Sequence, residues 1–338
     1  MHPINTHGPS FGYRRHGGVL GLLLYVLACV AAFGCVAGVA IARVNSPAGL
    51  VLPRADVVAP RPELVAPRQE RPGAVVSWPA YGVSAADVAG LGAMAGPGAT
   101  RPVPIASVAK VMTAYVVLHD HPLPAGGSGP GIVVQPSEAA AYPAQARDGE
   151  SLVPVAAGET ITERQALEAL LLPSADNMAW ILARWDAGSQ AAFVARMNAT
   201  AHRLGLTGTS YTDPSGLDPS TTSTAADQVR LGLAAMRVPA LASIAAMPRA
   251  VVPVAGVVRN YNTLLGQDGI VGLKTGSTQA AGGCVLIAAW HKAGAHDTLI
   301  VAATFGQPGT AQTILPNALE AGHMLVLALD RALRPSGR

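Results

Sequence analysis

An uncharged apolar run near the N-terminus limits which part of the 338-residue chain can form a water-soluble domain. Residues 18–42 read GVLGLLLYVLACVAAFGCVAGVAIA, long enough to cross a bilayer. Arg14 and Arg15 precede the run and favour a cytoplasmic N-terminus. A cleaved signal peptide is the alternative, because residues 40–42 form an A-x-A pattern, although the run is long for the apolar h-region of a signal peptide. Either interpretation predicts that the rest of the chain is exported.

Composition divides the chain after this run into a spacer and one large domain. Residues 43–73 hold prolines at 47, 53, 60, 62, 67 and 72 among scattered charges, which is typical of a stiff, extended linker. We therefore expect five segments: a cytoplasmic tail (1–17), an anchor or signal segment (18–42), a linker (43–73), one folded domain (74–333) and a short tail (334–338).

Charge and cysteine content argue against several kinds of partner. A formal net charge of +3, dispersed along the chain, does not indicate nucleic-acid binding. Cys29 and Cys35 fall in the apolar run, so Cys284 is alone in the exported part and cannot form an internal disulfide there. The stretch around it, GGCVLIAAW, predicts a core strand. No cysteine and histidine grouping has metal-ligand spacing, and we expect neither metal nor catalytic histidine.

Ser107 and Lys110 form an S-x-x-K pattern at the start of a predicted helix. Apolar residues then recur at helical spacing, and we expect the helix to end near His119. Residues three apart share one helix face, so Lys110 could take the proton of the Ser107 hydroxyl. That role requires a neutral lysine, favoured by burial or a nearby cation. The alternative is that Ser107 caps the helix and Lys110 extends to solvent.

A polar turn at residues 174–177, SADN, separates two predicted helices. Thr162 and Gln165 form a capping-box pattern that predicts the start of the first helix, which stops at Pro173. The turn leads directly into a second apolar helix. On its own, the turn is also explained by Ser174 or Asp176 acting as the N-cap of that second helix.

Residues 269–290 predict a β-hairpin, because two β-rich runs flank a turn of small residues. Lys274 is expected at the end of the first strand. Gly276 follows it, where a missing side chain would let a ligand approach the backbone. A solvated lysine at a strand end is the alternative interpretation.

Taken together, S-x-x-K at 107–110, SADN at 174–177 and KTG at 274–276 resemble the motif set of penicillin-binding proteins and serine β-lactamases. The sequence resembles low-molecular-weight penicillin-binding proteins of the serine D-alanyl-D-alanine carboxypeptidase family. The resemblance covers about residues 75–310. It includes DPSGLD (213–218), STAADQVRLGL (223–233) and NTLLGQDGIVGLKTG (262–276).

The resemblance implies an α/β (α+β) fold, in which a mostly antiparallel sheet is flanked by helices and joined by an all-helical subregion. It implies that Ser107 attacks the carbonyl between the two terminal D-alanines of a peptidoglycan stem peptide, with Lys110 as base. Ser174 would relay a proton to the leaving D-alanine. No metal or organic cofactor is implied, and β-lactams would act as inhibitors.

The same resemblance assigns the third motif to substrate binding. Lys274 and Thr275 would hold the substrate carboxylate, and the charge of Lys274 would help to keep Lys110 neutral. The backbone N–H of Ser107 and one from the strand after Gly276 would form the oxyanion hole. Family members often add an arginine beyond the following strand. This chain has no Lys or Arg between Lys292 and Arg331, so that contact is missing or comes from elsewhere.

Asp176 is the second departure, because the family usually has asparagine there. We expect Asp176 to occupy the site, with Asn177 pointing roughly 100° away around the helix. A carboxylate accepts but does not donate, and its charge favours the protonated forms of Lys110 and Lys274. We therefore expect an alkaline activity optimum.

Three other functions share these motifs. A β-lactamase with a deacylating glutamate needs one between the second and third motifs, and none occurs from Ala169 to Leu319. A transpeptidase would form the same acyl-enzyme, so the sequence does not separate it from a carboxypeptidase. The intact Ser107, Lys110 and Lys274 argue against a catalytically impaired peptidoglycan-binding homologue, while Asp176 in the asparagine position leaves that alternative open.

Overall fold

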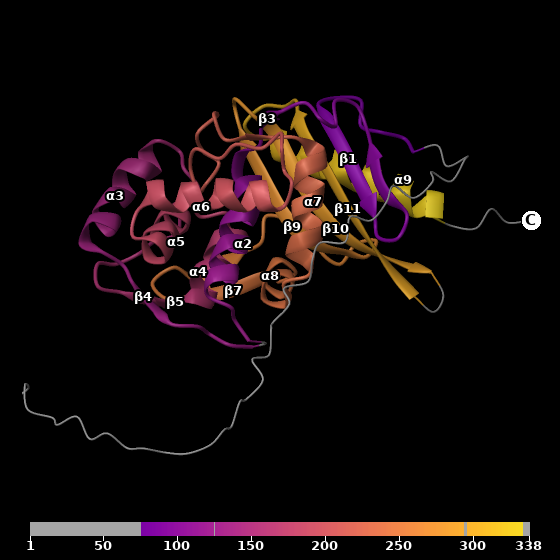
Figure 1. Cartoon of the computed structure of the whole chain (residues 1–338). Helices are drawn as coiled ribbons and strands as arrows, with labels where there is room; N and C mark the ends of the chain where they lie inside the picture. The colour runs from indigo at the N-terminus through magenta and orange to yellow at the C-terminus, as the bar shows by residue number, and fades with distance from the viewer. Residues whose placement is uncertain (1–75, 125, 294–295, 334–338) are drawn as a thin grey trace, which may run out of the picture. The chain divides into compact units, whose positions relative to one another are not determined.

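The computed structural model describes residues 76–124, 126–293 and 296–333 (Figure 1). The predicted tail, apolar segment and linker at 1–17, 18–42 and 43–73, and the short tail at 334–338, lie outside these residues. Among the helices of the described ranges, none has the length and apolar character that a bilayer crossing requires.

A five-stranded antiparallel sheet, in the order β2-β1-β11-β10-β9, forms one half of the domain. Its strands are β1 (Val83–Val88), β2 (Gly92–Ala95), β9 (Ile270–Thr278), β10 (Gly282–Ala293) and β11 (His296–Gln307). The predicted hairpin is confirmed as β9 and β10, in which Cys284 pairs with Gly276 and Leu286 with Lys274. Cys284 is fully buried, as its apolar surroundings predict.

Successive residues of β10 point to opposite faces of the sheet, which is how a strand reaches two cores. Leu286 and Ala288 join the larger core with residues of α7 (Ala225–Met236). Val285, Ile287 and Ala289 join a second core with residues of α9 (Ile314–Leu333). Figure 1 shows these two helices on opposite sides of the sheet.

An all-helical subregion packs beside β9. It begins with the 3₁₀-helix η1 (Ala106–Ala109) and α2 (Lys110–Asp120), which sits among the other helices (Figure 1). The others are α3 (Pro136–Arg147), α4 (Glu163–Leu171), α5 (Asp176–Ala187), α6 (Gln190–Arg203) and, beneath the sheet edge, α8 (Pro239–Ala245). The predicted capping box starts α4, because Thr162 and Gln165 each bond the other's backbone N–H.

The described residues also form three short two-stranded sheets outside the main sheet. They are β3 (Val103–Pro104) with β6 (Thr222–Ser223), β4 (Gly131–Val133) with β5 (Thr160–Thr162), and β7 (Arg249–Val252) with β8 (Gly256–Arg259). The β3–β6 pair fixes the chain just before η1 against the chain that follows residue 221. The architecture confirms the expected fold: an antiparallel sheet with helices on both faces and a helical subregion.

Candidate active site

Ser107 and Lys110 lie one turn apart, at the junction of η1 and α2. Lys110 is fully buried, and its Nζ lies 2.9 Å from Ser107 Oγ, which is half-buried. Ile105 takes the N-cap position of η1 and no side chain caps it. The alternative of a capping Ser107 and a solvent-exposed Lys110 is therefore wrong.

Lys110 Nζ has three acceptors within hydrogen-bonding distance. They are Ser107 Oγ at 2.9 Å, Asp176 Oδ1 at 2.6 Å and the backbone oxygen of Ser215 at 2.9 Å. An ammonium would donate to all three. A neutral amine would donate to Asp176 and Ser215 and turn its lone pair toward the Ser107 hydroxyl. The same heavy-atom geometry thus accommodates the proton on either Lys110 or Ser107.

Asp176 opens α5 and connects Lys110 to the segment before β5. Its Oδ2 accepts from Ser151 N–H at 2.9 Å, and its own N–H donates to Ser151 O at 2.6 Å. The Asn177 side chain lies elsewhere, bonded to both the N–H and the C=O of Val153. The structure therefore places Asp176, and not Asn177, beside Lys110.

Ser174 adopts a backbone φ of 64°, unusual for a residue other than glycine. The side chain is buried, and its Oγ has no hydrogen-bond partner among the described residues. Ala175, rather than Ser174 or Asp176, takes the N-cap position of α5, and no side chain caps it. The N-cap alternative is therefore wrong. A strained backbone and an unsatisfied buried hydroxyl are features that functional sites tolerate.

Lys274, Thr275 and Gly276 lie inside β9, not at its end. The prediction that Lys274 ends the first strand is wrong, because all three residues pair with β10 and the strand continues to Thr278. Lys274 is 1% exposed and donates to Thr275 O at 2.9 Å. Burial lowers the pKa of Lys274 well below its usual range, the Lys110 charge lowers it further, and Asp176 opposes both.

Gly276 brings β9 directly against η1. A Cβ at this position would fall 2.8 Å from Ser107 N and 3.1 Å from Val108 N. Only a residue without a side chain therefore permits this approach. The sequence predicts close approach of a ligand at Gly276, whereas the neighbour that the structure places there is the backbone of η1. The contact leaves the backbone of β9 beside the peptide N–H of Ser107.

Two participants in the cluster were not identified from the sequence. Ser215 contributes a backbone oxygen, and its only sequence signal was the DPSGLD stretch noted for resemblance. Glu150 adjoins the segment that binds Asp176. Burial raises the pKa of Glu150, as do the nearby charges of Asp176 and Asp148, while Lys110 lowers it. In the part of the chain that the structure describes, no group of three or more His, Cys, Asp or Glu side chains is arranged to hold a metal ion.

The cluster of Ser107, Lys110 and Asp176, with Gly276 of β9 against Ser107, can be compared with known proteins. A family model described as D-alanyl-D-alanine carboxypeptidase matches residues 94–306. This chain belongs to the D-alanyl-D-alanine carboxypeptidase family. The match includes all three motifs, so every site residue named from the sequence lies within the family region.

Individual relatives agree with this assignment. A D-alanyl-D-alanine endopeptidase of Pseudomonas aeruginosa is 35% identical over 192 residues, 55% of this chain and 59% of that protein. A D-alanyl-D-alanine carboxypeptidase of Mycobacterium tuberculosis is 43% identical over 136 residues, 38% of this chain and 46% of that protein. These matches span about half the length of the curated relatives.

A solved structure extends the comparison over more of the chain. The D-alanyl-D-alanine carboxypeptidase structure from M. tuberculosis H37Rv is 31% identical, covers 77% of this chain and 95% of that one, and superposes with a TM-score of 0.64. The likeness therefore includes both the sheet and the helical subregion.

Proposed function

We propose that this chain is a serine-type D-alanyl-D-alanine carboxypeptidase that acts on peptidoglycan stem peptides through an acyl-enzyme on Ser107. The observation that carries the proposal is the position of Lys110 Nζ, 2.9 Å from Ser107 Oγ. Its other two hydrogen-bonding directions are taken by Asp176 and Ser215, so a neutral Lys110 has its lone pair on the serine.

Acylation begins when Lys110 accepts the Ser107 proton and Oγ attacks the carbonyl carbon between the two D-alanines. The developing oxyanion accepts from the Ser107 N–H and from an N–H of β9 after Gly276. The Ser174 hydroxyl, which has no partner within the described ranges, donates its proton to the leaving nitrogen and receives the proton that Lys110 took from Ser107, so that Lys110 is neutral again before deacylation. The C–N bond then breaks, and free D-alanine departs.

Lys274 and Thr275 bind the carboxylate of the terminal D-alanine. Burial favours the neutral form of Lys274, and an arriving carboxylate favours its protonated form. Substrate binding thus adds positive charge close to Lys110 and favours the neutral base. This supplies the carboxylate contact although no arginine follows Lys292 until Arg331.

Deacylation uses water in place of the departed amine. Lys110 takes a proton from water as the water attacks the ester carbonyl, and Ser107 Oγ is reprotonated as the ester breaks. β-Lactams acylate the same serine, because their strained amide mimics the scissile bond, and act as inhibitors. No metal or organic cofactor enters these steps.

The direct test incubates the full-length protein with a diacyl-D-Ala-D-Ala peptide, with and without an acceptor amine. D-Alanine release that does not depend on the amine is expected. Release that occurs only with the amine would make the protein a transpeptidase. No release, together with no penicillin labelling of Ser107, would indicate a peptidoglycan-binding homologue without catalysis.

Endopeptidase activity is a second candidate, favoured by the 35% identity to the P. aeruginosa protein of that name. An endopeptidase cleaves a D-alanyl bond within a cross-linked peptide dimer, whereas a carboxypeptidase removes a terminal D-alanine. Offering both substrates to the same preparation separates them, because product masses differ by a whole stem peptide or by one D-alanine.

We further propose that residues 18–42 form a single membrane span, with the catalytic domain outside the cytoplasm. The support is the uncharged run preceded by Arg14 and Arg15. The full-length protein should remain in the membrane fraction after a high-salt wash, with its domain accessible to external protease. A mature N-terminus at Arg43 would instead identify a cleaved signal.

A further inference from the structure

The loop formed by residues 213–217, which we call the DPSGL loop, contacts η1 and α2 at three points. Thr113 Oγ1 donates to Pro214 O at 2.6 Å, and Lys110 Nζ donates to Ser215 O at 2.9 Å. Gly216 has a φ of 80°, and a Cβ there would fall 1.9 Å from Ala106 O. The loop therefore packs against the same two turns that carry Ser107 and Lys110.

Asp213 holds this loop in shape from within. Its Oδ2 accepts from the N–H groups of Ser215 (3.1 Å), Gly216 (2.8 Å) and Leu217 (3.0 Å) and from Ser215 Oγ (2.5 Å). Its Oδ1 accepts from Thr221 Oγ1 at 2.5 Å. Asp213 is 5% exposed. Only a carboxylate, with two acceptor oxygens and no N–H of its own, can accept from all five donors.

We propose that Asp213 is a positioning residue that fixes the Ser215 carbonyl on Lys110, so that the lone pair of the neutral lysine faces Ser107. The inference rests on the proposed function, in which Lys110 is the base. Lys110 reaches the loop through a backbone oxygen, so the side chain of Ser215 contributes nothing to the contact. What places that oxygen is the set of N–H bonds on either side of it.

Charged groups on three elements face Lys110. Asp176 of α5 pairs with it directly, Lys274 of β9 interacts with its charge, and so does Glu150 from the segment before β5. A substitution within the DPSGL loop leaves these three side chains chemically unaltered. Losing the Ser215 acceptor removes a hydrogen bond from both forms of Lys110, and the loss is greater for the ammonium because hydrogen bonds from a charged donor are stronger. Acylation should therefore reach half of its plateau rate at a lower pH.

Asp213→Asn tests the proposal, because the amide replaces one acceptor oxygen with a donor that faces the loop's N–H groups. The rate of acylation of the full-length protein by a fluorescent penicillin is measured from pH 5 to pH 10. We expect the high-pH plateau to fall between about tenfold and a hundredfold, as small misplacements of catalytic groups do. The midpoint of the profile should move about one pH unit lower.

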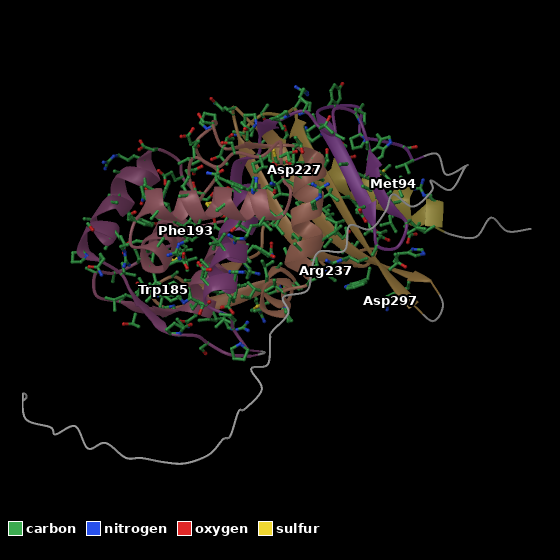
Figure 2. All side chains as sticks on the ribbon, viewed as in Figure 1. Met94, Trp185, Phe193, Asp227, Arg237 and Asp297 are labelled. Carbon is green, nitrogen blue, oxygen red and sulfur yellow. The ribbon has the colours of Figure 1, made fainter. Side chains whose placement is uncertain are left out.

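Asp227→Asn is the matched control. Asp227, labelled in Figure 2, is also a buried loop-organising aspartate, and its Oδ2 accepts from Gly208 N and Thr209 Oγ1, both at 2.8 Å. Within the described ranges, no hydrogen bond or ion pair joins Gly208, Thr209 or Asp227 to Lys110. This variant should lose thermal stability yet keep the wild-type midpoint.

Ser215→Ala provides a milder variant if Asp213→Asn does not fold. It removes one of the five donors to Asp213 and leaves the backbone carbonyl, so a smaller change in the same direction is expected. An unchanged midpoint in whichever of the two variants folds would overturn the inference. If wild-type protein is not acylated at all, the proposed function fails first, and that outcome is distinguishable.

Discussion

Replacing Asp176 with asparagine changes the charge beside the base with almost no change in shape. In the native chain, Asp176 Oδ1 lies 2.6 Å from Lys110 Nζ, and both side chains are buried. The negative charge favours the protonated lysine, which is not a base. Asp176→Asn should therefore let Lys110 act as a base at lower pH.

The size of the effect follows from the geometry. At 2.6 Å and an effective dielectric constant of about 20, the attraction between the two charges is roughly 6 kcal/mol. Desolvation of both groups offsets most of this. An adjacent opposite charge typically changes a titration midpoint by about one to three pH units. We expect the acylation midpoint to fall by that amount, and the rate near pH 7 to rise between about three- and tenfold. The gain is limited because a less basic lysine is a weaker proton acceptor.

The assay is the pH dependence of acylation by a fluorescent penicillin, with Asn177→Ala as control. Asn177 bonds Val153 rather than Lys110, so its loss should lower stability and leave the midpoint in place. Lower activity of Asp176→Asn without a change in midpoint would show that the Asp176 charge does not control Lys110 as a base. Loss of acylation in a folded Asn177→Ala variant would show that Asn177 fills the asparagine position.

Two further predictions concern stability and access to the oxyanion hole. Burial and the nearby Asp186 carboxylate raise the pKa of Glu163 to about 7, so the folded state favours the protonated form. That contribution is complete below about pH 4.5 and is lost as pH rises through 7, amounting to roughly 3 kcal/mol. Glu163→Gln, a permanent mimic of the protonated form, should therefore unfold at higher temperature than wild type at pH 8 but not at pH 4.5. Equal unfolding temperatures at pH 8 would contradict this. Gly276→Ala places a Cβ 2.8 Å from Ser107 N and should lower the acylation rate at least about tenfold with little change in circular dichroism; an unaltered rate would show that β9 and η1 separate freely.

Local patterns predicted the elements of the fold that depend on local physics. The capping box at Thr162, the helix after Ser107 and the β9–β10 hairpin each follow from spacing within a few residues. The antiparallel sheet and the helical subregion came from the family resemblance, because pairing between β1 and β11 joins residues over 200 positions apart.

The candidate site shows where local reasoning stops. The end of the first hairpin strand was placed at Lys274, but β10 continues to supply hydrogen-bond partners to Thr278. Ser174 was a plausible helix cap by residue type, yet Ala175 takes that position. The Ser215 oxygen on Lys110 has no residue-type signal, since every residue has a backbone carbonyl. Only the folded chain shows that this one reaches Lys110 across 105 positions.

The most direct test of Ser107 as the nucleophile is to locate the residue to which penicillin becomes covalently attached. Full-length protein is incubated with a penicillin, digested, and analysed by mass spectrometry, with Ser107→Ala as the comparison. One penicilloyl adduct is expected, on the peptide that contains Ser107, and neither adduct nor D-alanine release is expected in the variant. An adduct on another residue, or undiminished labelling of Ser107→Ala, would contradict it.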